Sequence, residues 1–408
     1  TRGAGSPRRL HAKSQIGGAA RNGSAALGHM IQADFQRTLS PYDRAVSQPS
    51  RWYFRLHIDP ILVLLLTVVI VYGLVILRSA VDGNEALYTA QLQRFAMAYV
   101  VLIVAAQIPP HFYLRIAPLA YVVGLFLLIL VLFFGVFVKG SQRWLEVPGL
   151  FRFQPSELMK LAVPMMVAWY LQRRSLPPSF KYTSACLVIM TLPALLIGRQ
   201  PDLGTSILVF GAGFSVLLLA GLSWRWVLWA GLAIGAAAPL VWQFVLEGYQ
   251  RQRILTLFDP QSDPLGAGWN IIQSTTAIGS GGLFGKGLFQ GSQSYLDFLP
   301  EARTDFIVAV MGEELGFVGV AFLLLMYLLI IARGLWLASE AGSTFGRLLA
   351  GAFVLTFFVY IFVNVAMVSG ILPVVGVPLP LVSYGGTSAI TLMAGFGVIM
   401  SVRTHKAW

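Results

Sequence analysis

The sequence predicts an all-α polytopic membrane protein with about ten transmembrane helices and a large extracytoplasmic loop between the seventh and eighth. Of its 408 residues, 57% are hydrophobic and only 11% are charged, whereas soluble domains carry about 25% charged residues. Apolar runs recur from Ile61 onward, and each is long enough for a bilayer, which takes about 17 to 25 residues. Lys and Arg gather on one side of these runs, as they do in cytoplasmic loops.

Residues 1–55 precede the first apolar run and are rich in Gly, Ala, Ser and Arg without a period. This composition predicts a disordered tail. The tail holds nine of the 29 Lys and Arg residues, which is typical of a cytoplasmic segment beside anionic lipid. The net charge is +12, but no nucleic-acid motif accompanies it, so we expect no nucleic-acid partner.

Residues 56–408 form the predicted membrane domain. Its ten predicted spans are 60–79, 92–108, 117–138, 156–172, 182–198, 204–221, 226–246, 305–332, 348–368 and 383–402. An even number of spans places both termini on one side of the membrane, and the basic tail makes that side cytoplasmic.

The predicted outer loops hold a large share of the carboxylates. These acids are Glu146, Asp202, Glu247, Asp259, Asp263, Asp297, Glu301 and Asp305. The loop over 247–304 far exceeds an ordinary connection, and its aromatic and aliphatic residues predict a packed outer subdomain with short interfacial helices. We therefore expect the chemistry at the outer face.

The glycine-rich run 278–288 invites comparison with a phosphate-binding P-loop. Ser280 stands where that motif needs its first Gly, Gly287 replaces the Ser or Thr, and no strand precedes the run. One interpretation is a structural turn segment. The other is a backbone nest beside a lipid-linked phosphate, with Lys286 as its cationic partner.

Asp305 lies where the eighth predicted span begins, near Asp297, Glu301 and Glu313. An acid at a membrane boundary is a functional candidate if it faces a cavity, because facing lipid is unfavourable. The alternative is a charge that stabilises the helix dipole.

Glu157 and Lys160 are three residues apart on one predicted helix and can form an ion pair, which Asp202 could join. Paired charges of this kind often only hold helices together. A substrate role requires that they line a cavity.

A proline-rich segment precedes the last predicted span. Pro373, Pro378 and Pro380 exclude a helix interior and predict an extended outer segment. The glycines and hydroxyls of 383–388 allow close helix packing. By contrast, the single cysteine, Cys186, excludes an intramolecular disulfide and a cysteine metal cluster.

Several ordered motifs across roughly residues 55–405 resemble the SEDS (shape, elongation, division and sporulation) family, and its RodA-type, rod-shape branch most of all. The motifs are Arg143-Trp144-Leu145, 153–160, 200–205, 263–268, 299–306 and 380–386, with 279–287 and 371–380 pointing to the rod-shape branch.

The resemblance implies a ten-helix peptidoglycan glycosyltransferase that polymerises lipid II at the periplasmic face of the bacterial cytoplasmic membrane during elongation. It implies Asp305 as the essential acid and functional roles for Trp144, Glu157, Lys160 and Asp202. It further implies a class B penicillin-binding protein transpeptidase and the elongation machinery as partners.

We expect an inverting displacement with Asp305 as general base, because the diphosphate leaves readily once its charge is neutralised whereas the attacking hydroxyl needs a base. Arg143, Lys286 and Arg303 are candidate pyrophosphate contacts by location. A divalent cation, Mg²⁺ or Mn²⁺, is a further candidate that could assist these residues at the diphosphate. No organic cofactor is expected. The rival hypotheses are a lipid II flippase, for which we find no internal repeat, and a scaffold for other wall enzymes.

Overall fold

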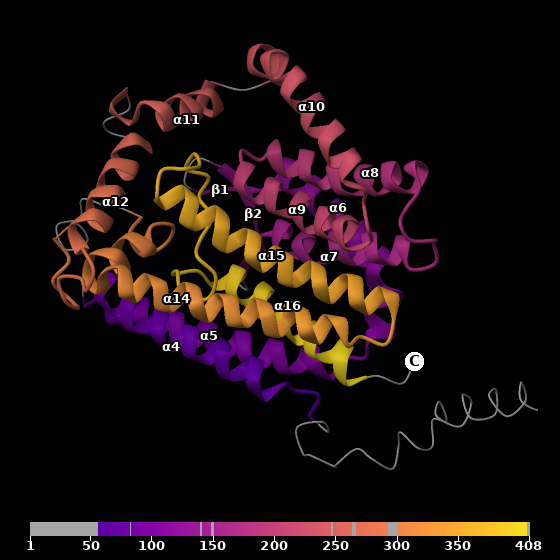
Figure 1. Ribbon diagram of the computed structural model, residues 1–408, viewed down its shortest axis with the longest axis horizontal. Coiled ribbons are helices and arrows are strands. Elements are labelled where there is room, and N and C mark those ends of the chain that lie inside the picture. The colour runs from indigo at the N-terminus through magenta and orange to yellow at the C-terminus, as the bar shows by residue number, and fades with distance from the viewer. Residues whose placement is uncertain are drawn as a thin grey trace, which may run out of the picture. The chain divides into compact units, whose positions relative to one another are not determined.

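The computed structural model describes residues 56–81, 83–138, 141–147, 151–245, 248–262, 267–292 and 301–405. Helices dominate this part of the chain (Figure 1). The predicted disordered tail, 1–55, lies outside the described residues.

Three long helices open the described chain: α4 (Pro60–Ala80), α5 (Glu85–Gln107) and α6 (Pro110–Phe134). Asp59 caps α4 by accepting a hydrogen bond from the Leu62 N–H at 2.9 Å, and Asn84 caps α5 in the same way through Leu87. Such caps satisfy backbone donors that have no partner in the helix.

A small antiparallel sheet follows, in the order β1 (Val136–Val138), β2 (Ser141–Val147) and β3 (Phe151–Phe153). Val136 pairs with Trp144, and Leu145 pairs with Phe153. The sequence predicts an outer loop after residue 138, so the sheet is an addition to the predicted all-α fold. Its short strands are rich in Val and Phe, which favour extended backbone.

Four helices of similar length come next: α7 (Pro155–Leu171), α8 (Phe180–Gly198), α9 (Leu203–Leu219) and α10 (Trp224–Leu240). A five-residue π-helix, Val241–Val245, continues α10. In Figure 1, α10 rises away from its neighbours, and its tryptophans Trp224 and Trp229 are exposed.

The long loop contains short helices, as predicted: α11 (Gly248–Phe258), a 3₁₀ turn (Pro260–Ser262) and α12 (Ala267–Gly281). Helix α12 packs against α14. Part of the loop, 293–300, lies outside the described residues, and so does Asp297.

The C-terminal helices are α14 (Ile307–Ser339), α15 (Thr344–Val368) and α16 (Gly386–Thr404), which pack against one another (Figure 1). Helix α14 is kinked at Gly316, whose φ of 67° and ψ of −164° are not helical. Phe317 N–H donates to the Gly282 carbonyl at 2.9 Å, so the glycine-rich run docks on the kink. Glycine permits this backbone geometry because it lacks a Cβ.

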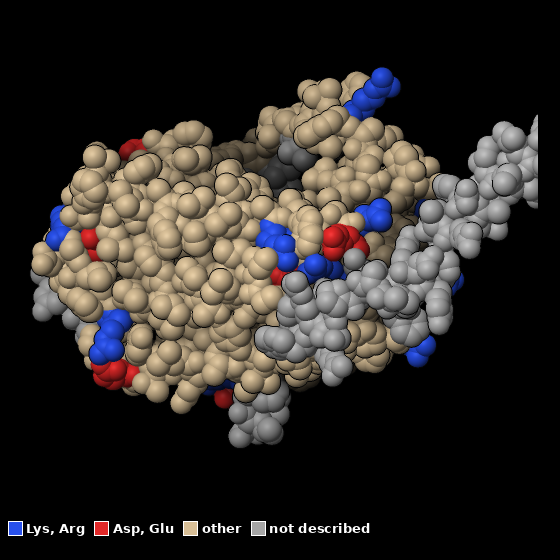
Figure 2. All heavy atoms as spheres, turned by 60° about the horizontal axis from the view of Figure 1, so that its bottom comes forward, with Lys and Arg blue, Asp and Glu red and all other residues tan. Residues whose placement is uncertain are grey.

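Each predicted span overlaps a helix in the described structure, although the end of the predicted span 117–138 lies in β1. Seven of these helices have at least 18 residues and enough apolar character to cross a membrane, and α7, α9 and α10 have 17 residues each. On the face drawn in Figure 2, charged residues are few among the described atoms. Many large apolar side chains of these helices are exposed, such as Leu119, Phe126 and Val188, and such a surface suits lipid. The polytopic membrane fold is therefore confirmed, while the count of ten spans stays a prediction.

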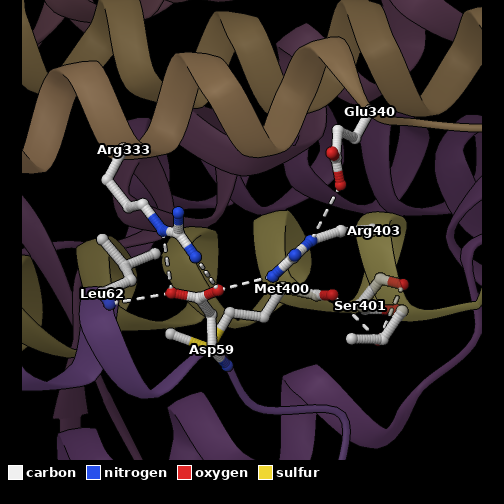
Figure 3. Close-up of polar contacts among 8 residues, drawn as sticks. Asp59, Leu62, Arg333, Glu340, Met400, Ser401 and Arg403 are labelled. Atoms are coloured by element: carbon white, nitrogen blue, oxygen red, sulfur yellow. Dashed lines mark hydrogen bonds and ion pairs between the residues drawn. The ribbon is translucent and has the colours of Figure 1, made fainter. Parts of the chain in front are cut away.

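At the far end of the bundle from β2, an ion network joins three helices (Figure 3). The Asp59 carboxylate, 1% exposed, accepts from Arg333 and from Arg403 at 2.6 Å each. Arg403 also pairs with Glu340 at 3.1 Å. The network therefore ties the start of α4 to α14 and α16.

Candidate functional site

A cavity of about 530 Å³ opens among α5, the β-sheet, α7, α9, α15 and the segment that leads into α16. Five of the predicted site residues line it: Arg143, Trp144, Glu157, Lys160 and Asp202. The structure therefore gathers into one space residues that the sequence places in three separate segments.

Glu157 and Lys160 lie in the first two turns of α7 and form the predicted ion pair, with Lys160 Nζ 2.7 Å from Glu157 Oε1. Lys160 is 6% exposed, and its ammonium also lies 5.2 Å from the centre of the Tyr360 ring on α15. The second carboxylate oxygen of Glu157 is buried without a hydrogen-bond partner among the described atoms. Because the pair lines a cavity, the condition for a substrate role is met.

Asp202 pairs with Arg143, not with Lys160 as the sequence analysis suggested. Asp202 Oδ2 lies 3.5 Å from Arg143 Nη1 and accepts from Gln154 Nε2 at 3.1 Å. Its other oxygen caps α9 by accepting from Thr205 N–H. Lys160 pairs with Glu157 on the same helix. Asp202 pairs instead with Arg143, which lies on β2.

Trp144 is the neighbour of Arg143 on β2 and also lines the cavity. Arg143 is fixed from the other side, because it donates to the Pro201 carbonyl at 2.6 Å. The sheet that was not predicted is therefore the element that carries the Arg-Trp motif to the cavity.

Asp305 lies two residues before α14 and is not among the described residues that line the cavity, but its carboxylate lies near one that does, Gly376. A methyl group built on Gly376, which lines the cavity and has a φ of 72°, would lie 3.5 Å from Asp305 Oδ2. The backbone carbonyl of Asp305 accepts from Asn364 Nδ2 at 2.8 Å. The Asp305 carboxylate thus lies near Gly376, in the proline-rich segment that forms one cavity wall.

Lys286 and Arg303 are not among the described residues that line the cavity. Lys286 Nζ lies 2.7 Å from the fully buried carboxylate of Glu313, and the backbone N–H groups of Lys286 and Gly287 donate to carbonyls of α14. These bonds favour the structural interpretation of the glycine-rich run. Arg303 contributes its backbone carbonyl, which accepts from Tyr384 N–H at 2.8 Å.

Two residues that were not predicted from the sequence support this site: Arg94, which lines the cavity, and the fully buried Asn364. Tyr384, which also lines the cavity, belongs to the motif 380–386 but had no role assigned to it. Arg94 carried a usable signal, because it is a charge inside a predicted span and such charges usually face a cavity. Asn364 carried no such signal, because it is an uncharged residue inside a long apolar run.

Among the described residues, no group of three or more His, Cys, Asp or Glu side chains is arranged to hold a metal ion. Mg²⁺ usually takes one or two carboxylates together with substrate phosphates. Glu157 and Asp202 line the cavity, and Asp305 lies near its wall at Gly376.

Residues 55–407 match the family model for the FtsW, RodA and SpoVE cell cycle proteins. The peptidoglycan glycosyltransferase MrdB of Escherichia coli K12 is 53% identical over 352 residues, which cover 86% of this chain and 95% of the relative. The probable peptidoglycan glycosyltransferase FtsW of Geobacter sp. strain M18 is 35% identical over 348 residues, which cover 83% of this chain and 93% of the relative.

Two solved structures share the fold. A chain from a peptidoglycan synthase complex, studied for its coordination of polymerization and crosslinking, is 30% identical with a TM-score of 0.76 and covers 86% of this chain and 98% of its own length. The rod shape determining protein RodA of Thermus thermophilus is 28% identical with a TM-score of 0.65, at the same coverage.

Proposed function

The chain belongs to the FtsW, RodA and SpoVE family of cell cycle proteins, and from this premise we propose that its cavity polymerises lipid II into glycan strands. The chain is a peptidoglycan glycosyltransferase of cell-wall elongation. The observation that carries the assignment of the site is the cavity itself, in which Arg143, Trp144, Glu157, Lys160 and Asp202 meet beside Asp305.

The reaction joins two lipid-linked sugars. The 4-hydroxyl oxygen of the acceptor sugar forms a bond to the anomeric carbon of the donor, and the bond from that carbon to the lipid diphosphate breaks. The electron pair leaves with the diphosphate, so the leaving group needs positive charge nearby. The hydroxyl proton needs a base, and we assign that role to Asp305, since its carboxylate lies near the cavity wall at Gly376.

The remaining cavity residues bind the substrate and shape the cavity. Arg143 is held by Asp202 and Pro201, which presets its guanidinium for an anionic group, because an oriented donor loses little freedom on binding. Lys160 supplies a second cation in the same cavity. Trp144 offers an aromatic face beside Arg143. The earlier assignments of Lys286 and Arg303 to the diphosphate stay predictions.

A divalent cation, Mg²⁺ or Mn²⁺, would be held by Asp305 together with substrate phosphate oxygens. When bound, it would neutralise charge on the leaving diphosphate. The protein residues still have to place the acceptor hydroxyl within reach of the carboxylate, which is about 3 Å for proton transfer.

The chain is a multi-pass inner-membrane protein. We place both termini in the cytoplasm and the cavity at the periplasmic face, because Lys and Arg concentrate at the opposite side of the predicted spans. We further propose a class B penicillin-binding protein as the crosslinking partner. This rests on similarity to a chain from a complex that coordinates polymerization with crosslinking.

The test uses purified protein in detergent with lipid II, alone and with a class B penicillin-binding protein whose own active serine is replaced. Detergent removes the two sides of the membrane, so flipping cannot register in this assay. Glycan polymer from the wild type supports the proposal. No polymer under any partner condition would overturn it, and a flippase or a scaffold would then account for the fold.

A further inference from the structure

The cavity contains a cation, Arg94, that has neither an assigned role nor a carboxylate partner among the described residues. Arg94 lies in α5, nine residues after its start at Glu85, which is about 14 Å along the helix axis. It lines the cavity and is half-buried. An arginine at this depth in a membrane helix marks a binding or transport path more often than a structural contact.

The other cavity cations have carboxylate partners. Arg143 pairs with Asp202, Lys160 with Glu157, and Arg152 with Glu146. Within the described chain, Arg94 has no carboxylate within ion-pair distance. Its guanidinium instead lies over the ring of Tyr384, with 4.5 Å between the guanidinium carbon and the ring centre. Stacking on an aromatic face orients a guanidinium and leaves its N–H donors available.

The surrounding residues hold this arrangement in place. Gln91, one turn before Arg94 on α5 and fully buried, accepts from Gly385 N–H at 3.3 Å and donates to the Ser383 carbonyl at 3.4 Å. Both bonds flank Tyr384 and fix its backbone against α5. The site is therefore built from two elements that are locked together.

The stacked pair also lies close to the proposed base. Tyr384 N–H donates to the Arg303 carbonyl at 2.8 Å, and Arg303 is two residues from Asp305. An anion bound at Arg94 would thus be held near the segment that carries the carboxylate.

We propose that Arg94, stacked on Tyr384, forms a binding subsite for the diphosphate of a polyisoprenyl-linked sugar. This inference rests on the proposed function and extends it to a named substrate group. The diphosphate is favoured over a carboxylate of the stem peptide, because the diphosphate is joined directly to the lipid tail and Arg94 lies within a membrane-spanning helix.

Gly386 provides a way to move Arg94 without removing its charge. A Cβ on Gly386 would lie 2.8 Å from Arg94 Cδ and 3.0 Å from Nε, so Gly386→Ala must displace the side chain. Arg94→Gln removes the charge, and Arg94→Lys keeps the charge without the planar fork. Arg174→Gln is a matched control, since Arg174 also stacks on a tyrosine, Tyr182, at 4.8 Å but lies beyond the other end of α7.

The experiment measures the binding of farnesyl diphosphate and farnesol to the full chain in detergent, together with KM and kcat for lipid II. We expect Arg94→Gln to weaken farnesyl diphosphate binding by roughly tenfold to a hundredfold. Arg94→Lys and Gly386→Ala should give smaller losses. Farnesol binding should not change, and Arg174→Gln should match the wild type.

Unchanged farnesyl diphosphate binding in Arg94→Gln would overturn the subsite, even if KM for lipid II rose, since that pattern points to the stem peptide. If Arg94→Gln fails to fold, Gly386→Ala replaces it in the test, and unchanged farnesyl diphosphate binding in Gly386→Ala would then overturn the subsite. Polymer formation by the wild type tests the proposed function, whereas farnesyl diphosphate binding by the variants tests the subsite. Either proposal can therefore fail without the other.

Discussion

Asn364 on α15 donates from Nδ2 both to the backbone carbonyl of Asp305, at 2.8 Å, and to that of Val377, at 2.7 Å. One buried amide thus joins the turn that carries the proposed base to the segment that walls the cavity. The position of Asp305 is determined by this contact as much as by the helix that follows it.

Replacing Asn364 with Leu should impair catalysis more than substrate binding. Two buried carbonyls would lose a donor, at about 1–3 kcal/mol each, and the Asp305 turn would shift relative to Val377. We expect a lower melting temperature and a lower kcat with a smaller change in KM. Ser274→Ala is the control, because Ser274 donates to the Val368 carbonyl at 2.9 Å from a fully buried position. It should lower stability and leave kcat intact, and equal kcat losses in both variants would refute the positioning role.

Breaking the Glu157–Lys160 pair from one side should be worse than removing both charges. Lys160→Met leaves a nearly buried carboxylate without its cation, and the loss of one partner of a buried pair destabilises by about 3–5 kcal/mol. The double variant Glu157→Gln, Lys160→Met should recover part of that stability, as thermal unfolding in detergent can show. It should not recover polymerisation, since Lys160 lines the cavity. A double variant less stable than Lys160→Met would contradict this interpretation.

The ion network at Asp59 should matter for stability but not for chemistry. Asp59→Asn keeps an acceptor for the α4 cap and removes the charge that pairs with Arg333 and Arg403 (Figure 3). We expect a lower melting temperature with kcat unchanged. Arg78→Gln serves for comparison, because its pair with Glu85 is largely exposed and such pairs contribute little. A kcat loss in Asp59→Asn at a temperature where it is folded would link the network to the cavity.

His57 should make stability depend on pH. Burial lowers the pKa of His57 below its ordinary value of 6.5, and the positive charge of the stacked His405 ring, 3.8 Å away, lowers it further. The unfolded chain therefore binds this proton at a higher pH than the folded chain does. The resulting stability is complete above pH 6.5 and is lost as pH falls through the lower folded pKa. Between about pH 7 and about pH 5, the melting temperature of the wild type should drop more than that of His57→Gln. Equal slopes would exclude His57 as the cause.

The sequence predicted most of what depends on local pattern. Hydrophobic runs located the helices, and the three-residue spacing of Glu157 and Lys160 predicted their ion pair, because both are consequences of periodicity along one element. The pairing of Asp202 with Arg143 joins residues 59 positions apart through a sheet that the sequence did not reveal. Arg94 was not predicted, because it lies within a predicted span and not in an outer loop, whereas the cavity reaches between the helices.

The most direct test of the central claim compares Asp305→Asn with the wild type in a lipid II polymerisation assay, in detergent and with the inactivated transpeptidase partner. The substitution conserves shape, and the Asn364 bond to the Asp305 backbone needs no carboxylate. Removing a general base lowers the rate by about 10²–10⁴-fold, and we predict a loss of at least that order with the melting temperature retained. Glu85→Gln, an exposed outer acid, should polymerise like the wild type. Glycan strands made by folded Asp305→Asn at the wild-type rate would contradict the assignment of Asp305 as the base.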